Sequence, residues 1–359
     1  MKVLKIAGFA AAALVGALIL TIQVITYHPD PIEEMKVHCP DDAPELSSDQ
    51  PIKVLDWNIQ YLAGKNYVFW YDTSDGTGKD VRPSSADIQT TLKRVQSVIR
   101  AENPDIVMLQ EVNVDAASTD HMDQIAAIMR GLPQQYKCHT SAYYWKADFV
   151  PDPHVMGSVG MKLLIISKYK ISSAQRHQLA MVPMDPVSSQ FYLKRAVLTA
   201  RMPVQNATDL VVLNTHLDAF AQGSDTMQRQ VAEVRDLLSS LSEEGVEWII
   251  GGDFNLLPPN WNRDQLAPID RVYYQEDSEI ANLFDAFQSS VSEETLNGPE
   301  QSRYYTHFPN SYTVKGPDRT IDYIFYSEGL KQLDYYVRGK DTLDISDHLP
   351  LVGTYQYSD

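Results

Sequence analysis

Apolar and polar residues recur along most of the chain in patterns that predict short strands and amphipathic helices. Residues 52–58 alternate as a strand does. Ser84 and Asp87 form a capping-box pattern, and the apolar residues after them recur at helical spacing until Pro104. Further strands are predicted over residues 105–110, 162–167, 194–202, 210–215, 246–251, 320–326 and 351–357, and further helices over 121–132 and 227–241.

These strands and helices are interleaved without an internal repeat. Several of the strands follow one another through short loops, which favours antiparallel pairing beside any parallel pairs. We therefore predict one α/β (α+β) domain with mixed sheets over residues 51–359, with no second domain boundary inside it.

An uncharged apolar segment precedes the domain. Two lysines lie within the first five residues, and residues 6–25 carry no charge, a length that spans a bilayer core at about 1.5 Å per residue. No pair of small residues follows that would suit a signal peptidase. We predict that residues 1–27 are an uncleaved signal anchor rather than a cleaved signal peptide. The remaining chain would then be extracytoplasmic, in a periplasm, a lumen or the extracellular space.

The segment between this anchor and the domain is rich in proline and acids and poor in large apolar residues, which predicts a linker over residues 28–50. It contains Cys39, and Cys138 is the only other cysteine of the chain. In an oxidising compartment the two either pair as a disulfide or remain inert thiols. The sequence leaves both alternatives open.

A long insertion follows the first strand of the domain. Residues 60–83 contain Tyr61, Tyr67, Phe69, Trp70 and Tyr71 among glycines and acids. Loops at strand ends often carry recognition, so this insertion either binds substrate or is a surface flap packed by its own aromatic side chains. Both interpretations fit the sequence.

Charge limits the kinds of partner that the protein can have. The formal net charge is −17, which argues against a broad basic surface that grips nucleic acid through counterion release. A locally basic cleft, or a metal ion that bridges to phosphate, remains compatible with this charge. Duplex DNA is therefore disfavoured as a partner without being excluded as a substrate.

Polar residues end several of the predicted strands. Residues 249–258 read IIGGDFNLLP, so an apolar strand ends in two glycines, and alternation points Asp253 and Asn255 the same way. Taken alone, this pattern also fits a simple turn. Oxygen ligands of this kind suit Mg²⁺ or Mn²⁺, and the chain has no cluster of Cys and His typical of zinc. The other such stretches are Asp56–Asn58, Leu109–Glu111, Asn214–Asp218, Arg319–Tyr323 and Ile345–Pro350.

Taken together, WNIQ, LQEV, NTHLD, GGDFN, TIDYIF and SDHLP resemble, in this order, the endonuclease/exonuclease/phosphatase superfamily with its DNase I-like fold. The resemblance covers essentially all of residues 51–359. It implies a four-layer α/β/β/α sandwich of two mixed, mostly antiparallel sheets flanked by helices. It also implies hydrolysis of phosphodiesters or phosphomonoesters with a divalent metal ion.

The same resemblance assigns roles to individual residues. Asn58 and Glu111 match the metal site, with Glu111 as the principal ligand, and Asp347 is a candidate ligand at a second position. The expected ion is Mg²⁺, with Mn²⁺ as an alternative. No residue in the sequence matches the glutamate that orients the catalytic histidine of some nuclease members.

The remaining matched residues would carry the chemistry. Asp253 would orient and deprotonate the attacking water, and Asn255 would hold that water and a phosphate oxygen. His348 would contact the scissile phosphate with its tautomer fixed by Asp322, while His216 would contact the phosphate from the other side or protonate the leaving group. The resemblance does not decide which histidine is the acid.

Three functions are therefore compared. We favour a membrane-tethered, Mg²⁺-dependent phosphoesterase whose substrate is a phosphodiester of lipid type or a small molecule. An extracytoplasmic DNase I-like endonuclease would use the same residues. A catalytically silent binding domain would keep the fold, but the complete set of matched residues argues against it.

Overall fold

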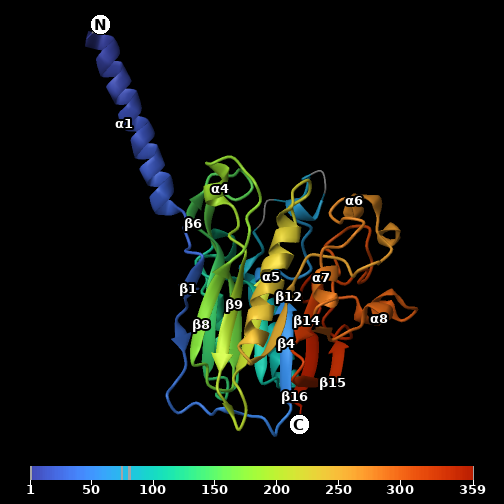
Figure 1. Cartoon of the computed structure of the whole chain (residues 1–359). Coiled ribbons are helices and arrows are strands. Elements are labelled where there is room, and N and C mark those ends of the chain that lie inside the picture. Colours follow the sequence, from blue (N-terminus) through green and yellow to red (C-terminus); the bar gives the residue numbers. More distant parts are fainter. Residues whose placement is uncertain (1, 74–75, 80–81, 359) are drawn as a thin grey trace.

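Two seven-stranded sheets lie face to face in the computed structural model, which describes residues 2–73, 76–79 and 82–358 (Figure 1). In each sheet one pair of neighbouring strands is parallel and the other neighbours are antiparallel. In order across the first sheet, the strands are β1 (Ile32–Glu34), β8 (Ser173–Gln178), β9 (Ala196–Met202), β11 (Leu210–His216), β12 (Glu247–Asp253), β14 (Asp322–Tyr326) and β13 (Gln288–Ser289).

The second sheet has the same number of strands. In order they are β15 (Leu330–Val337), β16 (Leu351–Tyr357), β4 (Ile52–Asn58), β5 (Ile106–Asn113), β7 (Gly157–Ser167), β6 (Cys138–Val150) and β2 (Val37–His38). A separate parallel pair is formed by β3 (Leu46–Ser47) and β10 (Val204–Gln205).

Helices cover the outer faces of both sheets. The helices are α1 (Lys2–Ile25), α2 (Ser85–Glu102), α3 (Gln124–Gly131), α4 (Ser188–Phe191), α5 (Thr226–Glu243), α6 (Pro268–Arg271), α7 (Ala281–Phe284) and α8 (Glu293–Asn297). Apolar faces of α2 and α3 pack on the second sheet, and those of α5 and α7 pack on the first. The predicted four-layer sandwich of mixed, mostly antiparallel sheets is confirmed.

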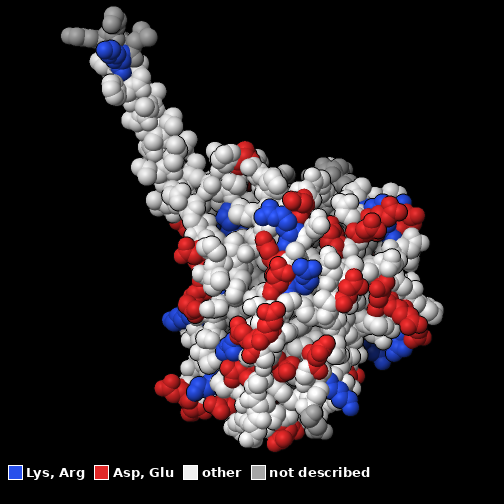
Figure 2. Space-filling model, in the orientation of Figure 1, with Lys and Arg blue, Asp and Glu red and all other residues white. Residues whose placement is uncertain are grey.

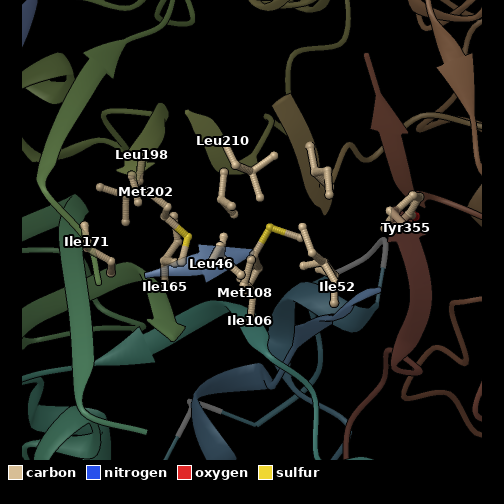
Figure 3. Packing of buried hydrophobic residues seen from close by; sticks show 14 of the residues in the cluster. Leu46, Ile52, Ile106, Met108, Ile165, Ile171, Leu198, Met202, Leu210 and Tyr355 are labelled. Atoms are coloured by element: carbon tan, nitrogen blue, oxygen red, sulfur yellow. The ribbon is translucent and has the colours of Figure 1, made fainter. Parts of the chain in front are cut away.

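The central core lies between the two sheets. Figure 3 shows Leu198, Met202 and Leu210 from the first sheet meeting Ile106 and Met108 from the second. These side chains are fully buried, and each such residue stabilises the fold by about 1.5–3 kcal/mol through removal of apolar surface from water. The packed core fixes the two sheets relative to each other, and with them the strand ends that carry the polar residues.

Most predicted elements are present, but the sequence pattern did not predict three of the longer strands of the domain: β6, β8 and β15. The predicted strand over residues 52–58 and the predicted cap at Ser84, which accepts a hydrogen bond from the Asp87 amide at 3.1 Å, are both confirmed. Strand β6 buries the small or polar residues Thr140 and Ala142 on its inner face, so the usual apolar alternation is weak.

The segment predicted as a linker differs from that expectation. Within residues 28–50, β1 pairs with β8 at the edge of the first sheet, β2 pairs with β6 at the edge of the second, and β3 pairs with β10. Cys39 and Cys138 form a disulfide with a Cα–Cα distance of 4.2 Å, which decides between the two alternatives left by the sequence. Edge strands bury little side-chain surface and therefore need few apolar residues. For this reason the sequence pattern did not predict these strands.

Helix α1 projects from this body as an isolated rod (Figure 1). Residues Lys5–Ile25 are long and apolar enough to cross a membrane, and none of the helix is buried by the rest of the protein. In Figure 2 the rod is white except for a blue patch of lysine near its free end, whereas acidic side chains are spread over the visible face of the domain.

The aromatic insertion divides between packing and cavity lining. Phe69 is fully buried in a small cluster with Tyr61 and Ala63, so the packing interpretation is right for this residue. Trp70 is only partly buried, lies stacked on His154 with ring centroids 4.6 Å apart, and lines the large cavity described below. The two neighbouring aromatics therefore have different roles.

This division gives a test with a matched pair of substitutions. Phe69→Ala is expected to lower the free energy of unfolding by about 3–5 kcal/mol, as large-to-small changes in a core do. Trp70→Ala is expected to lower the free energy of unfolding by less than Phe69→Ala does, since the Trp70 ring is only partly buried. Denaturant titration of the two variants checks the difference, and equal losses would show that the insertion packs as one unit.

Candidate active site

Strand register brings three of the predicted site residues side by side. His216 is paired with Asp253 across β11 and β12, and Asp253 is paired with Asp322 across β12 and β14. Side chains at paired positions point to the same face of a sheet. The glycines before Asp253 serve close packing, because a Cβ on Gly252 would lie 2.2 Å from the carbonyl oxygen of Thr215.

The second sheet contributes its residues from the ends of β4 and β5. Asn58 is paired with Gln110, and Glu111 follows at an irregularity in the β5–β7 pairing, with a left-handed backbone φ of 58°. A bulge of this kind redirects one side chain out of the regular alternation. Here it turns the Glu111 carboxylate to within 3.1 Å of the Asn58 amide nitrogen.

Asp253 lies at the centre of the assembled site. Its Oδ2 accepts a hydrogen bond from Asn58 Nδ2 at 3.0 Å and lies 3.3 Å from His216 Nε2 and 3.5 Å from His348 Nε2. Its Oδ1 accepts from the backbone amide of Asn255, so the turn interpretation of this stretch also holds. The Asn255 side chain, in turn, donates to the carbonyl of Leu217 at 3.1 Å.

His348 is held by a carboxylate on its far side. Its Nδ1 lies 2.9 Å from both oxygens of Asp322, which also accepts from the Thr306 hydroxyl at 2.6 Å. Burial lowers the pKa of His348, but Asp322 and Asp253 outweigh it and raise that pKa well above its usual value. His348 is therefore an imidazolium that points its Nε2 toward Asp253.

His216 has a different environment. The hydroxyl of Tyr144 lies 3.3 Å from its Nδ1. No glutamate that could orient His216 was found in the sequence, and this tyrosine occupies the corresponding place beside the ring. Burial first, and then the positive charge of Arg195, lower the pKa of His216 well below its usual value. The two imidazoles on either side of Asp253 therefore carry different charges, one neutral and one positive.

Arg195 was not identified by the sequence analysis. It is 4% exposed, lies over the Tyr144 ring at 5.2 Å and lines the cavity, and neither its Nε nor its Nη1 has a hydrogen-bond partner within the described chain. Buried donors of a charged group are costly unless something accepts from them. The buried carboxylate of Asp218, whose Oδ1 lies 4.0 Å from Arg195 Nε, balances part of this charge.

Two carboxyl groups of the site have raised pKa values. Burial, followed by repulsion from Asp347, raises the pKa of Glu111 to about 7. Burial also raises the pKa of Asp253 to about 7 although His348 opposes the shift. Carboxylate oxygens are ligands that Mg²⁺ and Mn²⁺ prefer, so Glu111 and Asp347 fit a divalent cation. Asn58 turns its Nδ2 toward the site while its Oδ1 accepts from the Gln60 amide, so its side-chain amide would have to rotate to offer an oxygen.

The insertion adds two further charged groups that the sequence pattern did not single out. Burial and then the charge of Asp347 raise the pKa of Asp72 to about 8. Lys65 donates to the carbonyl of Phe308, and its pKa is lowered to about 8 by burial, against the effect of Asp347. Both groups therefore adjoin the proposed second metal position.

A polar bridge beneath the site joins the two sheets. The side-chain nitrogen of Gln110 donates to Asp56 and to Asn214, each at 2.7 Å, across the gap between β5 and β11. Asn214 donates in turn to the backbone carbonyls of Leu109 and Leu164. These motif residues thus hold the strand ends in place and lie below the reacting groups.

A cavity of about 910 Å³ opens above the site. Its floor includes Glu111, His216, Asp253 and His348, and its walls rise through aromatic and aliphatic side chains. The volume is that of a site for a ligand of drug size or larger.

The sequence can now be placed among known proteins. The pattern that defines the Endonuclease/Exonuclease/phosphatase family matches residues 57–348, so the chain belongs to this family. Members are typically phosphoester hydrolases that use divalent metal ions. No curated protein matches the chain in sequence.

Solved structures show the same fold at low sequence identity. An endonuclease/exonuclease/phosphatase from Beutenbergia cavernae is 20% identical, covers 86% of this chain and 72% of its own, and has a TM-score of 0.58. The human Nocturnin catalytic domain with bound sulfate is 17% identical over 90% of this chain and 97% of its own, with a TM-score of 0.53. TDP2 from Caenorhabditis elegans is 16% identical over 89% and 76%, with a TM-score of 0.52.

Asp322 provides a test of how His348 is held. Asp322→Asn keeps the shape of the side chain but removes the charge beside the imidazole. We expect kcat to fall by about 10–100-fold, the usual effect of losing a partner that orients a site residue, with a smaller change in KM. Steady-state kinetics check this, and a variant with unchanged kcat would contradict the positioning role.

Proposed function

We propose that the protein is a membrane-anchored, divalent-metal-dependent phosphoesterase that hydrolyses a phosphodiester of lipid type or of a small molecule. The observation that carries this proposal is the position of Asp253, whose Oδ2 lies within 3.5 Å of both imidazoles. The same oxygen accepts from Asn58 Nδ2, which also donates to the Glu111 carboxylate. Family membership supports the reaction class.

Each group in this arrangement has a chemical task. Asp253 accepts a proton from the attacking water, and Asn255 adjoins it to position that water. His348 is a cation beside the place where charge builds up on the phosphate, and Arg195 adds a positive charge to the cavity wall on the other side. A divalent cation held by Glu111 and Asn58, with Asp347 at a second position, would supply Lewis-acid stabilisation of that charge.

His216 completes the set from the side of Arg195. Because its pKa is lowered well below the usual value, it is a neutral imidazole with the Tyr144 hydroxyl at Nδ1. Its Nε2 faces Asp253 and the cavity. We assign it to a hydrogen bond with the phosphate or the leaving group, and we assign the permanent positive charge to His348.

The anchor assignment rests on α1. The helix is of membrane-spanning length, lies free of the domain, and runs without a break to Ile25, where no pair of small residues marks a cleavage site. With lysines at its cytoplasmic end, the domain lies outside the cytosol. The disulfide between Cys39 and Cys138 agrees with an oxidising compartment.

This assignment predicts that the mature protein keeps residues 1–27 and remains in the membrane pellet after a high-salt wash. Salt screens electrostatic attachment but does not remove a helix embedded in the bilayer. Intact-mass measurement of the purified protein and fractionation check both parts. A mature chain that begins near residue 27 would show that the segment is a cleaved signal.

A substrate panel tests the reaction. The full-length chain in detergent micelles is incubated with sphingomyelin, phosphoinositides, an aryl phosphodiester, plasmid DNA and RNA, each with Mg²⁺, Mn²⁺ or EDTA. We expect metal-dependent cleavage of a lipid or small diester and none with EDTA. Preferred cleavage of DNA would instead identify an endonuclease, and no hydrolysis of any substrate with any metal would indicate a binding domain.

A further inference from the structure

The anchor joins the domain without any flexible linker. Helix α1 ends at Ile25, and the next residue, Thr26, pairs directly with Ala147 of strand β6. Tyr27 packs edge-on against Tyr143 at 6.3 Å, and its hydroxyl donates to Glu33 at 2.5 Å. The first residue after the helix is therefore already part of the folded domain.

The helix has no spare length either. Its apolar span contains 21 residues, which corresponds to about 31 Å at 1.5 Å per residue and matches the hydrocarbon thickness of about 30 Å. Once the helix spans the bilayer, Thr26 and Ala147 lie at the membrane surface. The orientation of the domain toward the lipid is then fixed by the fold.

Strand β6 leads from this junction to the cavity. It continues from Ala147 to Val150, and Val150 and the loop through Met156 line the cavity above the site. Figure 1 shows that α1 leaves the domain at the same end as α4 and α6, while the C-terminus lies at the opposite end. The mouth of the cavity and the membrane anchor thus share one end of the molecule.

Exposed apolar side chains gather around that mouth. Met156 is 61% exposed, Met184 43% and Phe220 45%, and all three line the cavity although they come from three different loops. Such residues usually mark an interaction surface when they lie together. Other exposed apolar residues are Phe149 on strand β6, Val187 at the start of α4, and Ile269 and Val272 in and just after α6.

Below the mouth, one wall of the cavity is apolar down to the site. Trp145 and Phe191 lie together on this wall, where the Trp145 indole nitrogen donates to the Phe191 carbonyl at 2.8 Å. Val155 and Val159 pack with them. An alkyl chain that entered at the mouth would meet apolar surface, while a phosphate on the same molecule would reach Arg195 and His348.

We propose that the cavity mouth is held against the outer surface of the bilayer and receives its substrate, a phosphoester with an apolar chain, directly from the lipid layer. This inference rests on the proposed function and adds a route of access and a substrate class to it. The rim defined by Met156, Met184 and Phe220 lies among the lipid headgroups. The net charge of −17 makes a second copy of this chain a poor occupant of this rim.

The two ends of strand β11 offer a matched test. Phe220 follows the site end of this strand, and Ala207, also exposed, precedes its opposite end. The described cysteines are paired in the disulfide, so a single introduced cysteine can be labelled selectively. Full-length Met184→Cys, Phe220→Cys and Ala207→Cys, each labelled with an environment-sensitive fluorophore, are reconstituted into phosphatidylcholine vesicles that contain nitroxide-labelled lipid.

We expect at least a several-fold stronger quenching by nitroxide lipid, with a blue-shifted emission, at positions 184 and 220 than at position 207. The same measurement on chains that also carry Glu111→Gln should give the same result, because membrane contact does not require turnover. Equal quenching at all three positions, or stronger quenching at 207, would overturn the proposal. Loss of residues 1–25 from the purified chain would overturn it as well.

A second arm separates access from chemistry. The wild-type chain in lipid nanodiscs is given either a long-chain phosphodiester or phosphomonoester within the same disc, or a soluble aryl phosphodiester in the buffer. We expect the lipid to be hydrolysed with at least 10-fold higher kcat/KM. Hydrolysis of the aryl ester alone would refute lipid access but leave the phosphoesterase proposal intact. Hydrolysis of neither substrate would refute the phosphoesterase proposal. The quenching experiment would still decide whether the cavity mouth contacts the membrane.

Discussion

Replacing Asp253 with asparagine is expected to lower kcat by about 10²–10³-fold, the usual loss when one element of charge stabilisation or proton transfer is removed. The amide keeps the size of the carboxylate and can still accept from Asn58 Nδ2. It cannot take a proton from water, and it leaves His348 without one of its two acidic neighbours.

Binding of Mg²⁺ by this variant separates two roles of Asp253. If the residue only activates water, calorimetry should show an affinity within a few-fold of the wild type. Loss of binding would instead make Asp253 a metal ligand. Asp105→Asn is the matched control, because Asp105 lies away from the site and accepts hydrogen bonds from the Lys53 amide and from Lys168. The kcat of this control variant should stay nearly unchanged.

Glu111→Gln is expected to abolish metal-dependent turnover, with a loss of at least about 10² in kcat/KM at limiting Mg²⁺. The substitution removes the ligand charge but keeps the volume and the hydrogen bond from Asn58. Because burial raises the pKa of Glu111 to about 7, the carboxylate destabilises the metal-free protein. The variant should therefore melt at the same or a higher temperature without metal.

The control for this experiment is Glu102→Gln. Glu102 is also a half-buried carboxylate, but it binds Lys53 and Arg338 at the end of α2 away from the cavity, and these partners lower its pKa against the effect of burial. We expect a lower melting temperature with normal kcat, the reverse of the Glu111 result. A Glu111→Gln chain with turnover within a few-fold of wild type would disprove the metal-site assignment.

The sequence predicts those site residues that lie at the ends of neighbouring strands. It does not predict the side chains that reach the site from other parts of the fold. His216, Asp253 and Asp322 lie together because neighbouring strands stop at the same edge, and a local pattern can show that. Tyr144 approaches His216 from the middle of an unpredicted strand. Arg195 immediately precedes β9, inside the range predicted as a strand, and its type alone does not distinguish it from other strand residues.

The fold, like the site, could be predicted from the sequence only where local patterns record it. Amphipathic helices and buried strands leave a periodic pattern, and these elements make the four layers. The short strands at residues 32–47 bury little surface, so composition alone reads them as a linker. Pairing of Cys39 with Cys138 depends on contacts across a sequence separation of 99 residues, which no local pattern records.

The edge strands that precede the domain also set an order for its biogenesis. Strand β1 pairs with β8, and β2 pairs with β6. Residues 32–38 leave the ribosome long before either partner strand, so these sheet edges close only when the chain has been made beyond residue 178. Under the anchor assignment proposed above, α1 would already be in the bilayer when these edges form. Closing the two sheet edges would then draw the domain onto the base of its own helix.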